Sequence, residues 1–116
     1  MRMAFNLQIY HLADGSSPYE EWFNGLDAVT ARRIDDSVSR MAAGNFCNCK
    51  PIESSTVNGV FERTLDFGPG WRVYYGRDGA TVVLLLTGGS KRTQRRDIAR
   101  ALSLWQDFKT RKAQNT

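Results

Sequence analysis

The residues best suited to chemistry are arginines, a lysine and tyrosines in the second half of the chain. Arg72 and Tyr74 alternate with apolar residues over residues 71–77, so they share one face of a predicted strand. Arg63 lies on the preceding predicted strand, and Lys91 follows a run of five Val and Leu residues. Metal-free RNA cleavage requires removal of a 2′-hydroxyl proton, stabilisation of the crowded phosphate and protonation of the leaving oxygen. Arg63, Arg72, Tyr74 and Lys91 are therefore the predicted catalytic residues.

A second basic group follows Lys91 at the start of the last predicted helix. Arg92, Arg95 and Arg96 lie where free backbone N–H groups favour an anion. Tyr75 offers a ring that can stack on a base, and it joins them as a predicted RNA contact. Residues 91–116 carry a net charge of +6, whereas residues 1–90 carry −2. This distribution indicates a polyanion or an acidic protein as partner, the alternative being a solvated helix and tail.

The general base is the weakest part of this pattern, because no histidine lies near the predicted sheet-to-helix junction. Asp66, Asp97, Lys91 or a tyrosine would have to serve. Arg63 also has a purely structural interpretation, since it shares its strand face with apolar residues. An unpaired buried charge is costly, so a salt bridge from Arg63 to Asp66, Glu62 or Asp97 is the alternative.

Other chemistries find little support in the sequence. Cys47 and Cys49 are the only cysteines, and their spacing is poor for a disulfide. His11 is the only histidine and lies far from both cysteines, so no metal site is predicted. The Gly-Gly-Ser-Lys-Arg-Thr run lacks the spacing of a phosphate-binding loop, and we predict no cofactor. No apolar stretch is long enough for a membrane span or a leader, so a cytoplasmic protein is expected.

The pattern of apolar residues predicts one α+β domain over residues 1–116, with a loose tail after about residue 111. Its sheet is expected to be mostly antiparallel and four-stranded, with helices on one face. Two helices precede the last three strands and one follows them, in the order β-α-α-β-β-β-α. The predicted strands are 5–11, 60–67, 71–77 and 81–87, and the predicted helices are 17–25, 28–43 and about 90–109.

Turn residues separate these predicted elements. Ser16 or Ser17 is expected to cap the first helix, with Pro18 in its first turn. The Asp78-Gly79 pair predicts a hairpin turn, and the pair at residues 88–89 is expected to break the last strand. Residues 45–58 are the least regular part and are predicted to form a connecting loop.

Three segments together resemble a known family. They are the GPGWRVYY turn and strand, the VVLLLTGGSK strand and turn, and the QRRDIARALSLWQDF helix. The RMAAGNF helix end and the segment through Lys50-Pro51 add to the likeness, which covers roughly residues 17–108. The chain thus resembles the phage-derived addiction module killer proteins, which belong to the HigB-like branch of the RelE/ParE toxin superfamily.

The resemblance implies a RelE-type fold and a toxin of a type II toxin–antitoxin module. Such a toxin is typically a metal-independent, ribosome-dependent mRNA endonuclease that inhibits translation. A small DNA-binding antitoxin, often helix-turn-helix, would neutralise it, so DNA contact would be indirect. Arg72 and Lys91 occupy the family's basic positions, and Tyr74 and Tyr75 match its aromatic pair. We expect an acidic antitoxin segment to bury Arg72 or Lys91.

One departure from the family keeps other functions open. Many relatives read Glu-Leu-Arg-Ile where this chain has Glu62-Arg63-Thr64-Leu65. The arginine is displaced by one residue, which moves its side chain to the other face of the sheet. A ParE-like gyrase inhibitor without catalytic activity, or an inactive module that binds its antitoxin, are therefore the alternatives to a nuclease.

Overall fold

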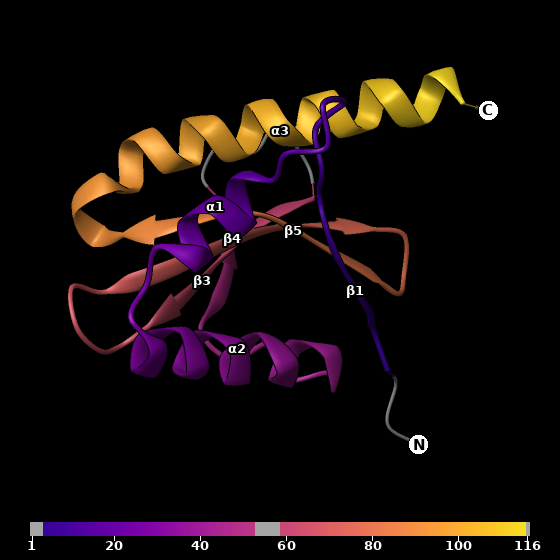
Figure 1. The fold of residues 1–116 in the computed structure, drawn as a ribbon. Helices are drawn as coiled ribbons and strands as arrows, with labels where there is room; N and C mark the ends of the chain where they lie inside the picture. Colours follow the sequence, from indigo (N-terminus) through magenta and orange to yellow (C-terminus); the bar gives the residue numbers. More distant parts are fainter. Residues whose placement is uncertain (1–3, 53–58, 116) are drawn as a thin grey trace.

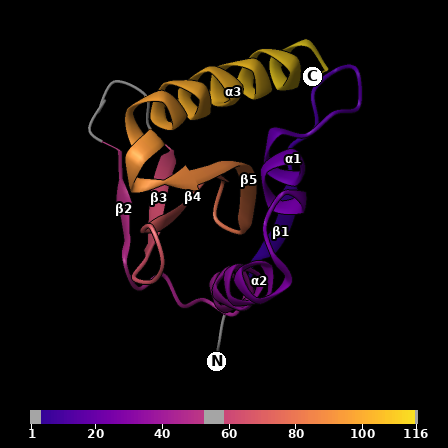
Figure 2. The same cartoon turned by 60° about the vertical axis from the view of Figure 1, so that its left-hand side comes forward.

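A five-stranded mixed sheet forms the centre of the molecule, with helices on both of its faces (Figure 1, Figure 2). The computed structural model describes residues 4–52 and 59–115. Its strands are β1 (Asn6–Ile9), β2 (Cys49–Pro51), β3 (Val60–Leu65), β4 (Trp71–Asp78) and β5 (Val82–Ser90). Its helices are α1 (Pro18–Asn24), α2 (Ala28–Ala42), the 3₁₀ turn η1 (Lys91–Thr93) and α3 (Gln94–Gln114).

The strand order is β1-β5-β4-β3-β2, with β1 parallel to β5 and the other pairs antiparallel. The predicted α+β class and order of long elements are confirmed, but the predicted count of four strands is wrong. Strand β2 lies within the predicted loop 45–58 and pairs with β3, where Lys50 stands opposite Glu62. Residues 53–58 of that predicted loop lie outside the described residues.

Side-chain caps begin the first two helices, and the cap of α1 is one that the sequence predicts. Ser17 Oγ accepts a hydrogen bond from the Glu20 amide at 3.2 Å, and Pro18 occupies the first turn of α1. Asp27 Oδ2 accepts from the Thr30 amide at 3.1 Å at the start of α2. Helix α3 continues through Gln114, beyond its predicted end near residue 109. The described residues include no helix with both the length and the apolar composition needed to cross a bilayer.

The expectation of helices on one face is wrong, because apolar side chains leave the sheet in both directions. Helix α3 covers one face, and α1 and α2 cover the other, as Figure 2 shows. The core under α3 includes Tyr74, Leu84, Leu86, Ala101, Leu104 and Trp105. The core under α1 and α2 includes Tyr19, Ile34, Val38, Met41, Val73, Tyr75, Val83 and Leu85.

The glycine pair in β5 serves close packing rather than strand termination. Gly88 and Gly89 were expected to end the strand, yet β5 continues through Ser90. A Cβ at Gly88 would overlap the Trp22 ring, and one at Gly89 would overlap the Asp97 carboxylate. The missing side chains therefore let α1 and α3 approach the sheet from opposite faces.

Candidate functional site

Strand β3 sends two neighbouring charged side chains to opposite faces of the sheet. Glu62 pairs with Tyr74 and points to the α3 side, whereas Arg63 pairs with Val73 and points to the α2 side. Both are buried, with 1% exposure for Glu62 and 4% for Arg63. A charge is costly to bury, so the partners of each side chain decide what it can do.

Glu62 is surrounded by donors from three different elements. Gln94 Nε2, at the start of α3, donates to Glu62 Oε2 at 2.8 Å. Arg72 Nε on β4 lies 3.6 Å from Glu62 Oε1, and Lys50 Nζ on β2 lies 3.9 Å from the same oxygen. The carboxylate thus has two cations beside one oxygen and an amide bonded to the other.

Three buried polar atoms at this place have no hydrogen-bond partner among the described residues. They are Glu62 Oε1, Arg72 Nε and the Tyr74 hydroxyl. Arg72 Nε and Glu62 Oε1 lie 3.6 Å apart as an ion pair, so these two atoms face each other just beyond hydrogen-bond distance. A pocket of about 540 Å³ adjoins this ion pair, lined by Lys50, Pro51, Ile52, Glu62, Gln94, Arg95 and Ile98.

Tyr74 has no exposed surface and cannot stack on a base in this conformation. Burial, followed by the negative charge of Glu62, raises the pKa of the Tyr74 hydroxyl well above its usual value. The phenol therefore stays protonated at neutral pH and can donate a hydrogen bond, but it cannot act as a base.

The Gly-Pro-Gly turn brings Lys91 next to Arg72. Arg72 Nη1 donates to the Gly70 carbonyl at 2.7 Å, and the Lys91 amide donates to the Pro69 carbonyl at 3.4 Å. A Cβ built at Gly70 would lie 3.1 Å from Arg72 Nη1 and 3.3 Å from Lys91 Cβ. Gly70 also has a φ of 75°, a backbone angle that residues with a side chain rarely adopt. The turn therefore places these two predicted site residues side by side.

The three arginines predicted to contact RNA separate around the start of α3. Arg92 is exposed on η1, and Arg95 lines the Glu62 pocket. Arg96 instead lies 3.5 Å from the Asp97 carboxylate and lines a different groove, which it shares with Trp22 of α1. Only Arg95 of the three thus lines the pocket beside Glu62.

Arg63 and Tyr75 lie on the α2 side, so the expected single cluster of cations and tyrosines is wrong for these two. Arg63 Nε donates to Ser37 Oγ at 2.6 Å, and its Nη1 donates to the Asn45 carbonyl at 3.1 Å. The expected salt bridge from Arg63 to a carboxylate is not found among the described residues. Tyr75 lies in the core with its ring stacked on Phe61, at 5.6 Å between centroids. The physical reason is strand alternation, which separates neighbours by face.

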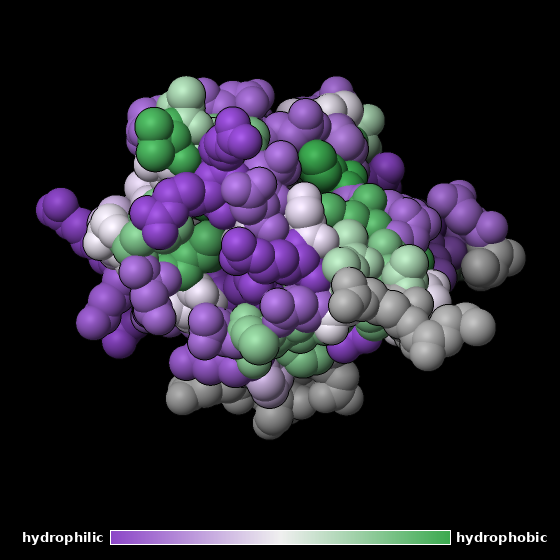
Figure 3. All heavy atoms as spheres, turned by 90° about the horizontal axis from the view of Figure 1, so that it is seen from below, coloured by the Kyte–Doolittle hydropathy of each residue, from purple (hydrophilic) through white to green (hydrophobic). Residues whose placement is uncertain are grey.

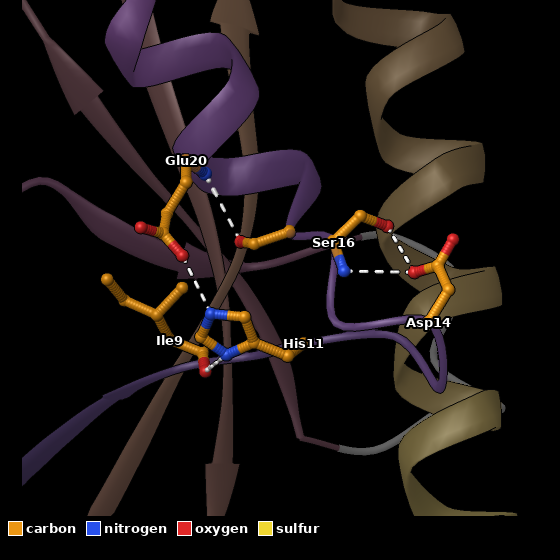
Figure 4. Close-up of polar contacts among 6 residues, drawn as sticks. Ile9, His11, Asp14, Ser16 and Glu20 are labelled. Atoms are coloured by element: carbon orange, nitrogen blue, oxygen red, sulfur yellow. Dashed lines mark hydrogen bonds and ion pairs between the residues drawn. The ribbon is translucent and has the colours of Figure 1, made fainter.

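His11 lies between β1 and α1 and contacts residues of both elements (Figure 4). Its Nε2 lies 2.7 Å from Glu20 Oε1, and its Nδ1 lies 3.0 Å from the Ile9 carbonyl. Asp14 accepts from both the amide and the hydroxyl of Ser16, which lowers the pKa of the Asp14 carboxyl. In residues 4–52 and 59–115, no three His, Cys, Asp or Glu side chains gather in a way that could hold a metal ion.

Glu62, Gln94 and Lys50 are the site residues that sequence reasoning missed as functional groups. Glu62 was considered only as a salt-bridge partner of Arg63, although alternation puts it on the face of Arg72 rather than that of Arg63. The useful signal was the register of β3 and β4, which places Glu62 opposite Tyr74 and beside Arg72. Lys50 could have been found only by predicting strand β2, because the pairing of β2 with β3 places Lys50 directly opposite Glu62.

The arrangement of helices and sheet has a counterpart among solved structures. One chain of the crystal structure of the toxin–antitoxin complex RelBE2 from Mycobacterium tuberculosis aligns with a TM-score of 0.58. The alignment covers 77% of this chain and 100% of that chain, with 13% sequence identity. The protein therefore has the RelE-like fold.

Comparison of sequences identifies a relative of this chain. An uncharacterized protein of Haemophilus influenzae is 34% identical over 91 residues, which cover 78% of this chain and 88% of the relative. This chain belongs to the same family as that protein. No model of a known protein family matches it.

Proposed function

We propose that this protein is the toxin of a type II toxin–antitoxin module, in the HigB-like branch, and that it cleaves mRNA on the ribosome without a metal. The observation that carries the proposal is the buried Glu62 carboxylate, with Arg72 and Lys50 beside one oxygen and Gln94 on the other. The RelE-like fold supports it, since a chain of a toxin–antitoxin complex shares that fold.

In this proposal Glu62 is the general base. Gln94 holds Oε2, whereas Oε1 makes no hydrogen bond but is buried, so bound RNA must displace the groups that cover Oε1 before this atom takes the proton of the attacking 2′-hydroxyl. The 2′-oxygen then attacks phosphorus and the bond to the 5′-oxygen breaks. Lys50, whose side chain is 68% exposed, donates a proton to that leaving oxygen. The result is a cyclic phosphate and a free 5′-hydroxyl.

The neighbouring cations stabilise the extra negative charge that develops on the phosphate. Arg72 Nε lies 3.6 Å from Glu62 Oε1, and Lys91 stands next to Arg72 across Gly70. Arg95 lines the same pocket, and Arg92 is exposed one turn earlier, so both contact the RNA backbone on either side of the cut. Backbone contacts of this kind weaken steeply as salt rises.

The partners follow from the same charges. A cognate antitoxin, a helix-turn-helix DNA-binding protein in this proposal, covers the basic rim with an acidic segment and buries Arg72 or Lys91. Such a segment would neutralise the cations that the phosphate needs. The toxin itself then meets DNA only through its antitoxin, and its target, translated mRNA, places its action in the cytoplasm.

A binding role without catalysis is the second candidate, either as a gyrase inhibitor or as an inactive antitoxin-binding module. The pairing of Glu62 with Arg72 favours it, because a carboxylate and a guanidinium 3.6 Å apart already neutralise each other. The position of Arg63 on the other face favours it too, since the pocket then has one cation fewer than in many relatives.

The deciding experiment is induced expression in a bacterial host, followed by growth curves and primer extension on an abundant mRNA. Three proteins are compared: the wild type, the double variant Arg72→Ala/Lys91→Ala, and Arg32→Ala, whose exposed side chain on α2 is the matched control. The proposal expects arrest and new mRNA 5′ ends for the wild type and the control, and neither for the double variant. Arrest with intact mRNA would support gyrase as target, and no arrest would support an inactive module.

A further inference from the structure

A second pocket lies on the opposite side of the sheet, between α2 and the end of β3. Its volume is about 350 Å³, and its charged lining residues are Arg33, Arg40, Arg63, Asp36 and Asp66. Figure 3 views the molecule from the α2 side and shows hydrophilic side chains gathered across the middle of this face. Of the residues that the sequence predicted for RNA cleavage, only Arg63 lines this pocket, and the proposed cleavage mechanism does not use Arg63.

The notable member of this lining is Arg63, because its charge has no anionic partner. Its hydrogen bonds go to Ser37 Oγ, the Asn45 carbonyl and Cys49 Sγ, the last at 3.4 Å. Within residues 4–52 and 59–115, its guanidinium forms no ion pair and its Nη2 makes no hydrogen bond. Arg63 as a whole is only 4% exposed, and its hydrogen-bond partners are neutral, so it lacks the counter-charge that buried ions normally have.

The charged side chains at the rim of the pocket do not neutralise Arg63, so its counter-charge has to come from outside the protein. Asp36 and Asp66 are both exposed, and neither forms an ion pair with Arg63. Arg33 places its guanidinium over the Phe67 ring at 3.8 Å rather than on a carboxylate. Arg40 is exposed and likewise forms no ion pair among the described residues.

The charge balance favours a singly charged anion. Three arginines and two aspartates give the pocket a net charge of +1. A single monoanion neutralises that charge, whereas a phosphate dianion would bring an excess of negative charge close to both aspartates. Apolar surface of Leu65 and Phe67 forms part of the wall, which suits the methylene groups and apolar neighbours of an acidic side chain.

We propose that this pocket binds the carboxylate of a Glu side chain in an acidic segment of a partner protein. The carboxylate enters between the rim arginines and pairs with the guanidinium of Arg63. The pocket gives the protein a docking surface that leaves the Glu62 pocket on the other face open. The inference stands independently of RNA cleavage.

The test uses two blocked peptides that differ by one group, acetyl-Leu-Glu-Leu-amide and acetyl-Leu-Gln-Leu-amide. Binding is followed by NMR through the Nε–H signal of Arg63, with inorganic phosphate as a third probe at matched ionic strength. The Glu peptide is expected to shift this signal at concentrations where the Gln peptide and phosphate do not. Arg63→Met is expected to weaken Glu-peptide binding about tenfold or more, read from backbone signals of α2.

Matched variants keep the test decisive even if Arg63→Met folds poorly. Arg40→Met removes an exposed rim cation and should also weaken the Glu peptide, whereas Arg32→Met should not. Asp66→Asn raises the net charge of the pocket and should tighten binding. Equal binding of the Glu and Gln peptides, a response to phosphate alone, or no response to any probe would each overturn the proposal.

Discussion

Glu62 and Arg63 are neighbours in sequence, are both buried and carry opposite charges. The two faces of the sheet nevertheless give them different kinds of partner. On the α3 face, Glu62 has two cations nearby and one oxygen without a hydrogen bond. On the α2 face, Arg63 is held by neutral groups at 2.6 and 3.1 Å. The first arrangement is a buried carboxylate that lines a pocket and to which we assign proton transfer. The second arrangement is a cation held by neutral hydrogen-bond partners, and we propose that it binds an anion from outside.

The largest expected effect comes from removing the cation beside Glu62. Arg72→Gln should lower the rate of mRNA cleavage by roughly 10²–10³-fold, because the developing phosphate charge loses its principal donor. The rate is measured by primer extension on an mRNA translated by purified ribosomes. Arg32→Gln, which removes an exposed arginine on the other face, should cleave like the wild type. Equal rates for the two variants would remove Arg72 from the chemistry.

Close packing on the two faces can be compared through one glycine on each. Gly76 lies against the Trp105 ring on the α3 face, and Gly88 lies against the Trp22 ring on the other. Each Gly→Ala change should lower the free energy of unfolding by about 1–3 kcal/mol, since a Cβ would overlap the ring. Urea denaturation measures the loss. Gly25→Ala is the control, because its φ is −84° and the nearest atom to its Cβ is 3.5 Å away.

Deleting one hydrogen-bond partner on each face should separate stability from activity. Ser37→Ala leaves Arg63 Nε without its 2.6 Å acceptor and should cost about 1–3 kcal/mol of unfolding free energy while cleavage persists. Gln94→Ala frees Glu62 Oε2 and should slow cleavage with a smaller loss of stability. Ser39→Ala, exposed on the same helix as Ser37, is the control for the first change. Cleavage that falls with Ser37→Ala as much as with Gln94→Ala would contradict the division of roles.

The smallest effect concerns the cap of α2. The hydrogen bonds from Thr30 lower the pKa of the Asp27 carboxyl below its ordinary value, so the folded state binds this proton less readily than the unfolded state. The resulting stabilisation is present above the ordinary aspartate pKa and is lost as the pH falls below about 4. Asp27→Asn should therefore flatten the decline of the urea midpoint in acid. An unchanged acid decline would show that the cap contributes nothing.

Much of the fold was predictable because its long elements have strong local signals. The Ser17 cap, Pro18 and the aromatic residues of α1 mark one helix, and the Val-Leu run marks β5. Strand β2 was missed because a three-residue edge strand has no periodicity to read. The glycine pair after the Val-Leu run resembles a strand end, and only the Trp22 ring and the Asp97 carboxylate packed against it explain why the strand continues.

The candidate site was predictable only in part. Alternation along β4 correctly joins Arg72 to the face of Tyr74. The glycine turn that places Lys91 beside Arg72 was seen only in the structure. The proposed role of Glu62 could not be predicted, because β3 carries two adjacent charges and its sequence does not say which of them faces which helix layer. That choice is made by packing, since α2 offers Ser37 to one face and α3 offers Gln94 to the other.

The most direct test compares the two neighbours in a single assay, ribosome-dependent cleavage of an mRNA by the purified protein, with circular dichroism to verify folding. The variants are Glu62→Gln and Arg63→Met. The account predicts that Glu62→Gln loses cleavage by about 10²-fold or more while Arg63→Met, once folded, retains it. Full cleavage by Glu62→Gln, or loss of cleavage in a folded Arg63→Met, would contradict the claim that the α3 face carries the chemistry.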